Sequence, residues 1–329
     1  MADLRLTLAC GEYGRMWALK DETVKPEGIE LVFLPLNHPA EIFWRMMRYQ
    51  EFDISEMSAS SFMIAKDKGM PFVGIPVFPA RCFRHSYVFV RKDSGIKLPQ
   101  DLQGKRVGTP EYQMTAGLWI RGFLQHDYNV SPSAIHWFTG GQIIPGREER
   151  VQTALPKNVQ WIGPSRTLTE MLVARELDAI ASPYIPQTLM EGPDAPVRRL
   201  FENYKQVEKD YYSRTKIYPI MHMVVVREAL YKDYPWITQS LYKAFCESKK
   251  RYFEQLDRFG PAWFDLPWLR EAYEETKEVL GEDLCPYGVE ANRPTLEALT
   301  QYSFEQGLAK QKFTPEGLFA PNTFRQFAE

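Results

Sequence analysis

The sequence predicts an α/β protein built from two lobes. Strand-like and helix-like patterns alternate along the chain, which is typical of sheets joined by short helical crossovers. The chain has 329 residues, more than the roughly 250–300 residues that one hydrophobic core usually serves. A change of composition at residues 96–108 and a long apolar run at 218–226 indicate where the chain crosses between the lobes.

The first part of the chain alternates strands and helices. Residues 4–9 alternate apolar and polar side chains and end at a tight turn, residues 10–14. Pro39 begins a helix after a cap at Asn37 or His38. The other expected elements are strands at 28–36, 52–57, 72–78 and 86–91 and a helix at 62–68.

The middle and last parts continue this alternation. A polar connection at 98–108 enters a strand, and Thr167 with Glu170 forms a capping box that starts a helix. The remaining elements are helices at 114–126, from Ile237 onward and at 293–308, strands at 135–138, 179–182 and 218–226, and a loop-rich segment at 140–164.

Two crossings place the first and last thirds of the chain in one lobe. We expect lobe I to contain residues 1–98 and 217–329, and lobe II to contain residues 99–216. A cleft between two such lobes would bind a small ligand.

Composition limits the classes of partner. The 40 Lys and Arg residues nearly balance the 42 Asp and Glu residues, giving a net charge of −2, which argues against nucleic acid or an anionic membrane as the main partner. No apolar stretch approaches the ~18–20 residues that span a bilayer. The four cysteines are far apart in the chain and form no metal or disulfide pattern. The N-terminus lacks a secretory-signal pattern, so we expect a cytoplasmic protein.

Several segments resemble a known fold. They are DLQGKRVG at 101–108, YQMTAG at 112–117 and TLTEMLVARELDAI at 167–180. These segments are similar to type II periplasmic binding proteins. The resemblance implies that each lobe is a mixed sheet flanked by helices, with the ligand cleft between the lobes.

Narrower motifs resemble one enzyme family. They are FPARCFRHS at 78–86, CPYGVEANRP at 285–294 and FTPEGLF at 313–319. Together they resemble the 4,5-dihydroxyphthalate decarboxylases, carboxy-lyases of phthalate catabolism. The resemblance implies conversion of 4,5-dihydroxyphthalate to 3,4-dihydroxybenzoate (protocatechuate) and carbon dioxide.

That reaction needs proton transfer and carboxylate binding. A base near the hydroxyl para to the departing carboxylate would push electron density into the ring, and an acid would protonate the ring carbon. Arg81, Arg84 and His85 lie within five residues. In an extended segment Arg81 and His85 would share one face, so Arg81 could bind a carboxylate and His85 could transfer the proton. Ion-pair roles for both arginines are the alternative.

Other candidates follow predicted strands. Glu12 and Tyr13 follow the first strand, where α/β folds place ligand-binding loops, and Glu12 is a candidate base or a solvated turn residue. His222, in an apolar strand, is the second acid/base candidate or a core residue. Further candidate substrate-binding residues are Tyr13, Ser58, Ser60, Arg84, Tyr112, Thr115 and Tyr184. Thr115 begins a helix, where free amides favour an anion, or it only caps that helix.

No metal or nucleotide motif is present, so a reaction without cofactor is the default and no metal ligand is assigned. The predicted function is cofactor-independent decarboxylation of a small aromatic carboxylate by a homo-oligomer. The alternative is a non-enzymatic protein that binds or senses an aromatic carboxylate.

Overall fold

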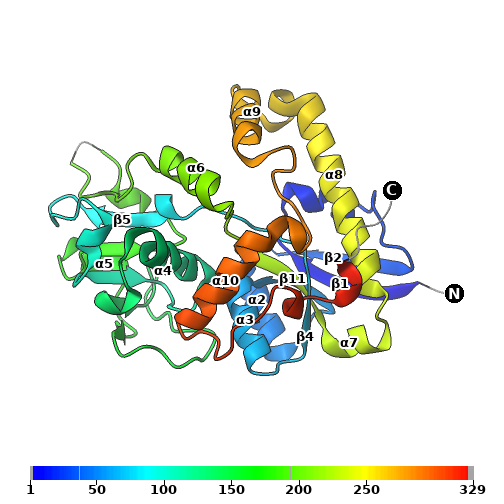
Figure 1. Ribbon diagram of the computed structural model, residues 1–329, viewed down its shortest axis with the longest axis horizontal. Helices are drawn as coiled ribbons and strands as arrows, with labels where there is room; N and C mark the ends of the chain where they lie inside the picture. Colours follow the sequence, from blue (N-terminus) through cyan, green and yellow to red (C-terminus); the bar gives the residue numbers. More distant parts are fainter. Residues whose placement is uncertain (1–2, 37, 193, 325–329) are drawn as a thin grey trace. The chain divides into compact units, whose positions relative to one another are not determined.

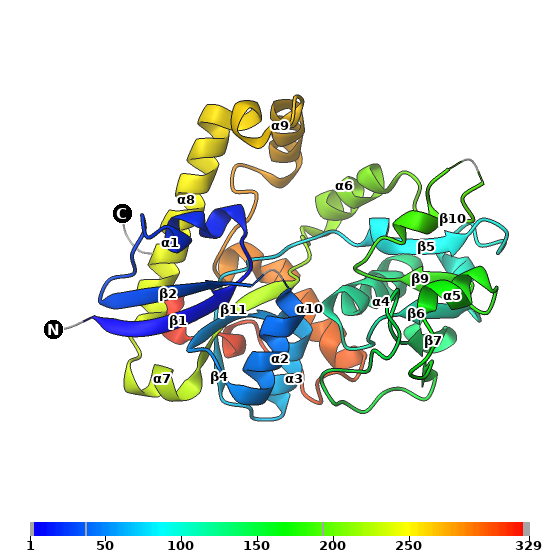
Figure 2. The ribbon, with the colours of Figure 1, turned by 180° about the vertical axis from the view of Figure 1, so that it is seen from behind.

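The computed structural model describes residues 3–36, 38–192 and 194–324. Contacts divide the chain into two compact units, which are shown in Figures 1 and 2. Unit 1 contains Met1–Arg81, Thr215–Glu297 and Phe313–Glu329, and unit 2 contains Cys82–Arg214 and Ala298–Lys312. The first boundary thus follows Arg81, whereas the sequence placed it after residue 98, and a stretch near the C-terminus that was expected in lobe I belongs to unit 2.

Unit 1 contains a five-stranded mixed sheet in the order β2-β1-β3-β11-β4. β1 is parallel to β2 and β3, while β11 is antiparallel to β3 and β4. The strands are β1 (Leu4–Cys10), β2 (Ile29–Pro35), β3 (Ile54–Ser58), β4 (Phe72–Ile75) and β11 (His222–Arg227).

Several helices of unit 1 pack on this sheet, while α9 contacts α8 instead. α8 packs against α1, and α2 packs on β3. The helices are α1 (Trp17–Lys20), α2 (Pro39–Tyr49), α3 (Ala59–Asp67), α7 (Glu228–Asp233), α8 (Ile237–Phe264) and α9 (Leu269–Leu280). α10 (Arg293–Glu305) contains the boundary between the units at Glu297.

Unit 2 contains a six-stranded sheet in the order β10-β5-β9-β6-β7-β8. Its strands are β5 (Val88–Arg91), β6 (Arg106–Thr109), β7 (His136–Thr139), β8 (Val159–Trp161), β9 (Ala179–Ala181) and β10 (Val197–Arg199). Its helices are α4 (Thr115–Tyr128), α5 (Leu168–Val173) and α6 (Tyr204–Thr215), the last of which ends at the unit boundary. Both sheets are mixed, as the sequence predicted.

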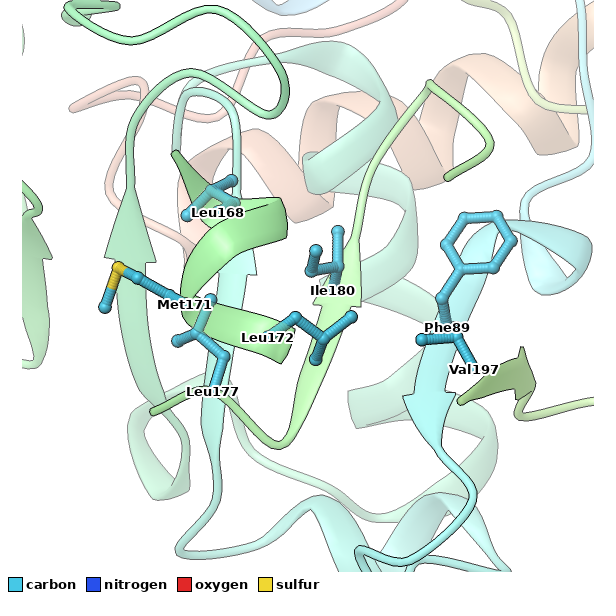
Figure 3. Packing of buried hydrophobic residues seen from close by; sticks show 7 residues of the cluster. All are labelled: Phe89, Leu168, Met171, Leu172, Leu177, Ile180 and Val197. Atoms are coloured by element: carbon cyan, nitrogen blue, oxygen red, sulfur yellow. The ribbon is translucent and has the colours of Figure 1, made fainter. Parts of the chain in front are cut away.

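The core of unit 2 forms where α5 packs on the sheet. Leu168, Met171 and Leu172 of α5 form one buried hydrophobic cluster with Phe89 and Ile180 of the sheet (Figure 3). The predicted capping box starts this helix, because Thr167 Oγ1 accepts the Glu170 N–H at 3.1 Å and Glu170 Oε2 accepts the Thr167 N–H at 2.9 Å.

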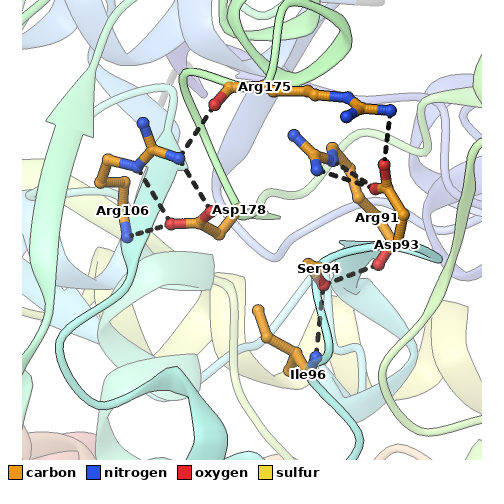
Figure 4. Close-up of polar contacts among 7 residues, drawn as sticks. All are labelled: Arg91, Asp93, Ser94, Ile96, Arg106, Arg175 and Asp178. Atoms are coloured by element: carbon orange, nitrogen blue, oxygen red, sulfur yellow. Dashed lines mark hydrogen bonds and ion pairs between the residues drawn. The ribbon is translucent and has the colours of Figure 1, made fainter.

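An ion-pair network fixes neighbouring strands of unit 2 at one end (Figure 4). Arg106 donates from Nε to Asp178 Oδ2 at 3.1 Å and from Nη2 to Oδ1 at 2.9 Å. Because Arg106 opens β6 and Asp178 directly precedes β9, this fork joins the two parallel strands where both begin.

Most predicted elements are present, with corrections at their ends. The second helix begins at Ala59, directly after β3, rather than at residue 62. Residues 218–221 precede β11 instead of belonging to it, and Ile220 forms only an isolated bridge with Arg81. Asn37, one predicted cap, lies outside the described residues; His38 occupies the cap position but makes no side-chain capping bond. Within the described residues, no helix has both the length and the apolar composition needed to cross a membrane.

Candidate active site

A buried carboxylate lies where β1 and β3 end and β11 begins. Glu56 of β3 has no exposed surface, which is rare for a carboxylate without partners. Val224 of β11 pairs with Glu56, and His222 pairs with Ser58. His222 is therefore the diagonal neighbour of Glu56 on the same face of the sheet, within reach of its side chain.

Glu56 accepts hydrogen bonds at both oxygens. His222 Nδ1 lies 2.5 Å from Glu56 Oε1, and the Tyr13 hydroxyl donates to the same oxygen at 2.6 Å. The Gly11 N–H donates to Oε2 at 2.9 Å, and Cys10 Sγ lies 3.6 Å from that oxygen. Burial alone would raise the pKa of Glu56, but His222 and the hydrogen bonds from Tyr13 and Gly11 outweigh it and lower that pKa. Glu56 is therefore a carboxylate.

The charged state of Glu56 fixes the roles of its neighbours. Burial and the nearby Glu56 raise the pKa of Tyr13 far above its usual value, so Tyr13 remains a neutral donor. Because Glu56 can only accept, His222 Nδ1 carries a proton. No hydrogen bond joins Nε2 to any residue that the structure describes, and 19% of the His222 side chain is exposed. Nε2 is thus the atom that could exchange a proton with a ligand.

Phe43 of α2 helps to orient the imidazole. Its ring lies edge-on to that of His222, with centroids 4.8 Å apart. The predicted residues Tyr13 and His222 are therefore brought together, with a contact of 3.4 Å between the hydroxyl and Nδ1. Glu56 was not predicted, although a lone acidic residue inside an apolar strand was a usable signal.

The sequence-predicted base Glu12 has a different environment. It is exposed on the turn after β1 and forms an ion pair with Lys20. This is the solvated turn position that the sequence left open. Ser58 and Ser60, at the start of α3, lie with their hydroxyl oxygens 3.3 Å apart.

The segment containing Arg81 and His85 is not extended, which corrects the expectation that the two side chains share a face. Arg84 has φ −127° and ψ 1°, and His85–Tyr87 form a 3₁₀ turn. Arg81 belongs to unit 1 and His85 to unit 2. Arg84 is buried, with its guanidinium 4.7 Å from the centre of the Tyr87 ring.

His85 lies in an aromatic core. Its ring stacks on Phe123 at 4.1 Å and contacts Tyr128, Phe201 and Tyr211. Neither ring nitrogen has a hydrogen-bond partner among the described residues. Burial, with a smaller effect from Arg214, lowers the pKa of His85 to about 3. At neutral pH the ring is uncharged and enclosed, which suits packing better than proton transfer.

The remaining predicted residues lie in unit 2. Tyr112 is buried under the Arg121 guanidinium, 3.7 Å from its ring centre, and Thr115 is the first residue of α4. Directly before this helix, Glu149 accepts the backbone N–H groups of Tyr112 at 2.5 Å and Gln113 at 3.3 Å. Tyr184 is 42% exposed.

Comparison with known proteins places the chain in a family. It is 36% identical over 330 residues to the 4,5-dihydroxyphthalate decarboxylase of Comamonas testosteroni, with 99% of each chain covered. The chain belongs to the 4,5-dihydroxyphthalate decarboxylase family. A second member, from Pseudomonas putida, is 38% identical over 215 residues, covering 64% of this chain and 83% of that protein.

More distant similarities concern the fold of this decarboxylase family. Residues 18–152 match the family described as ABC transporter, phosphonate, periplasmic substrate-binding protein. The aliphatic sulphonate binding protein SsuA of Escherichia coli is 14% identical with a TM-score of 0.55, covering 99% of this chain and all of SsuA. SsuA from Xanthomonas axonopodis pv. citri is 12% identical with a TM-score of 0.53 and covers 98% of each chain. The periplasmic binding protein fold expected from the sequence is confirmed.

Proposed function

We propose that this protein decarboxylates 4,5-dihydroxyphthalate to 3,4-dihydroxybenzoate and carbon dioxide, and that His222 transfers the proton. The observation that carries the assignment of His222 is its hydrogen bond to the fully buried Glu56. Relatives named for this reaction support the substrate class.

The reaction exchanges one carboxylate for one proton. The carbon–carbon bond to the departing carboxylate breaks, its electron pair remains on the ring carbon, and a proton forms the new C–H bond there. A hydroxyl para to that carbon can feed electron density into the ring as it loses its proton. His222 Nε2 is suited to either proton transfer, because Glu56 holds Nδ1–H and stabilises the imidazolium that forms. Such a group typically contributes about 10²–10⁴-fold to the rate.

Substrate-binding roles predicted from the sequence remain proposals. In unit 1 they concern Tyr13, Ser58, Ser60 and Arg81; in unit 2 they concern Arg84, Tyr112, Thr115 and Tyr184. Glu12 and His85 remain predicted catalytic residues, but the mechanism proposed here does not use them. Reaction without a cofactor, a cytoplasmic location and a homo-oligomeric state also remain predictions.

Turnover by purified protein tests the proposal. Incubation with 4,5-dihydroxyphthalate, with and without a metal chelator, should release one carbon dioxide per 3,4-dihydroxybenzoate formed. In deuterium oxide the product should carry one deuterium at the carbon that lost the carboxylate. His222→Gln should lower kcat at least 100-fold. Substrate binding without turnover by the unmodified protein would contradict the decarboxylase assignment, and full turnover by the variant would contradict the role of His222.

A further inference from the structure

Two guanidinium groups in unit 1 have no carboxylate partner among the described residues. Arg15 lies in the 3₁₀ turn Gly14–Met16, and its Nη2 donates to the Pro79 carbonyl at 2.5 Å. Arg81 donates to the carbonyls of Tyr218 at 3.1 Å and Pro286 at 2.8 Å, and to the Asn292 side chain. All of these acceptors are neutral.

Both guanidinium groups have a buried N–H donor without an acceptor in the described parts of the chain. Nε of Arg15 and Nε of Arg81 are buried and have no described hydrogen-bond partner. Burial, with a smaller effect from the repulsion by Arg15, lowers the pKa of Arg81 to about 10. Burying two neighbouring cations without an anion costs free energy. A bound anion would offset this cost, so the cluster favours anion binding.

A hydroxyl group lies beside these cations. Tyr287 is 6% exposed, and its hydroxyl lies within interaction distance of the Arg15 guanidinium. The positive charge of Arg15 acts on this hydroxyl. The acid on the same segment, Asp283, is 2.5 Å from Lys249 and therefore already paired.

The Arg15–Arg81 cluster adjoins the proton-transfer group. The Ala80 carbonyl accepts the N–H groups of Met221 at 2.9 Å and His222 at 3.3 Å, and Arg81 bridges to Ile220. From the other side, Arg15 is two residues from Tyr13, which contacts His222. A small ligand that reaches His222 therefore meets positive charge nearby.

We propose that Arg15, supported by Arg81 and the Tyr287 hydroxyl, binds the carboxylate that the aromatic substrate retains. Arg81 already donates hydrogen bonds to the segment 286–292, whereas Arg15 donates to the Pro79 carbonyl. Arg15 is therefore the principal residue that binds the carboxylate. The inference rests on the proposed function and extends it to substrate selection.

This arrangement gives a reason for the reaction to stop after one carbon dioxide. The product still has a hydroxyl para to its remaining carboxylate, so ring electronics alone do not forbid a second decarboxylation. Held at Arg15, that carboxylate is kept away from the position where His222 acts. The site therefore selects an aromatic ring with two adjacent carboxylates, one to bind and one to lose.

Calorimetric titration with unreactive ligands tests this inference apart from turnover. The probes are 3,4-dihydroxybenzoate and 1,2-dihydroxybenzene, which differ by the carboxylate alone. The unmodified protein should bind the carboxylate-bearing ligand at least about tenfold more tightly. Arg15→Met should lower the affinity for 3,4-dihydroxybenzoate at least about tenfold and change the affinity for 1,2-dihydroxybenzene less than about threefold.

Three further variants keep the test decisive. Arg15→Lys retains the positive charge but loses the planar guanidinium that binds a carboxylate with two hydrogen bonds. Its affinity for 3,4-dihydroxybenzoate should lie between those of the parent and Arg15→Met. Tyr287→Phe removes only one hydroxyl, so it should fold normally and weaken 3,4-dihydroxybenzoate binding severalfold, even if Arg15→Met does not fold. Arg5→Met, at an exposed ion pair with Glu30, is the matched control and should leave both affinities unchanged.

The outcomes separate this inference from the proposed function. Turnover combined with unchanged 3,4-dihydroxybenzoate affinity in folded Arg15→Met and in Tyr287→Phe would overturn the inference and leave the decarboxylase intact. Carboxylate binding that depends on Arg15 without any turnover would support the anion site and overturn the decarboxylase. An equal loss of affinity for 3,4-dihydroxybenzoate and 1,2-dihydroxybenzene in Arg15→Met would also overturn the inference.

Discussion

Nδ1 of His222 lies 2.5 Å from Oε1 of Glu56, although 166 positions separate the two residues in the chain. The antiparallel pairing of β11 with β3 produces this contact, because it makes the residues diagonal neighbours on one face. The carboxylate, with no exposed surface, fixes which imidazole nitrogen carries the proton. Four predictions follow from this site and from two other titratable groups, the buried His85 and the half-buried Glu149.

Glu56→Gln should lower kcat by about 10²–10⁴-fold with a small change in KM. The amide keeps the shape of the side chain but cannot stabilise an imidazolium or select its tautomer. Steady-state kinetics on 4,5-dihydroxyphthalate would measure the effect. The control is Glu30→Gln, an exposed carboxylate on β2, which should retain full activity. A folded Glu56→Gln protein with parental kcat would remove Glu56 from the mechanism.

Tyr13→Phe should lower kcat about 10–100-fold and destabilise the protein by about 1–3 kcal/mol. It removes one donor from the buried carboxylate, and the loss of such a hydrogen bond has this order of cost. Kinetics and urea denaturation would be measured together. Tyr49→Phe, at a 58% exposed position, should change neither quantity. An unaltered rate in Tyr13→Phe would show that the hydroxyl serves only folding.

His85→Leu should change kcat less than about threefold and make the protein less sensitive to acid. The folded-state pKa of His85, about 3, is below the unfolded value of about 6.5. The unfolded chain therefore binds more protons between these values, and His85 makes stability fall as the pH drops through this window. The parent should lose about 1 kcal/mol per pH unit relative to the variant. Urea denaturation at several pH values would measure this, and a large loss of kcat would instead restore His85 as a catalytic residue.

The stability of the parent protein should fall as the pH rises through the titration of Glu149. Glu149→Gln should abolish this fall. Burial, aided by the nearby Glu111, raises the folded-state pKa of Glu149 to about 7, above the unfolded value of about 4.3. The folded state thus holds the extra proton between these values, so stability falls as the pH increases from about 4.3 to about 7, by on the order of 2 kcal/mol. Thermal unfolding across this range is the measurement. The exposed neighbour Glu148 provides the control, since Glu148→Gln should retain the parental slope; a parental slope in Glu149→Gln would contradict the assignment.

The elements were predictable because their signals are local. The alternation at residues 4–9 and the capping box at Thr167 depend on neighbours within a few positions, and both gave the correct element. Element ends were less predictable. The helix expected to begin at residue 62 begins at Ala59, directly after β3, and His38 makes no side-chain capping bond at the start of α2.

The candidate site was only partly predictable. Tyr13 could be singled out because it follows the first strand, and His222 because it is a lone histidine in an apolar run. Glu56 was overlooked because nothing near it in the sequence shows what pairs with it. The grouping of Arg81 with His85 gave the opposite error, since closeness in sequence suggested a shared face that the backbone does not provide.

By itself, the sequence determined the α/β alternation, the periplasmic binding protein fold and the family, because periodicity and motifs are carried by contiguous residues. Tertiary structure decided which charges have partners. Strand register brought His222 to Glu56, and aromatic packing enclosed His85. The turn after β1 placed Arg15 near Arg81, and neither has a carboxylate partner among the residues that the structure describes. The physical reason is that burial and charge compensation depend on distant segments, so the protonation state of a group becomes defined only when those segments meet.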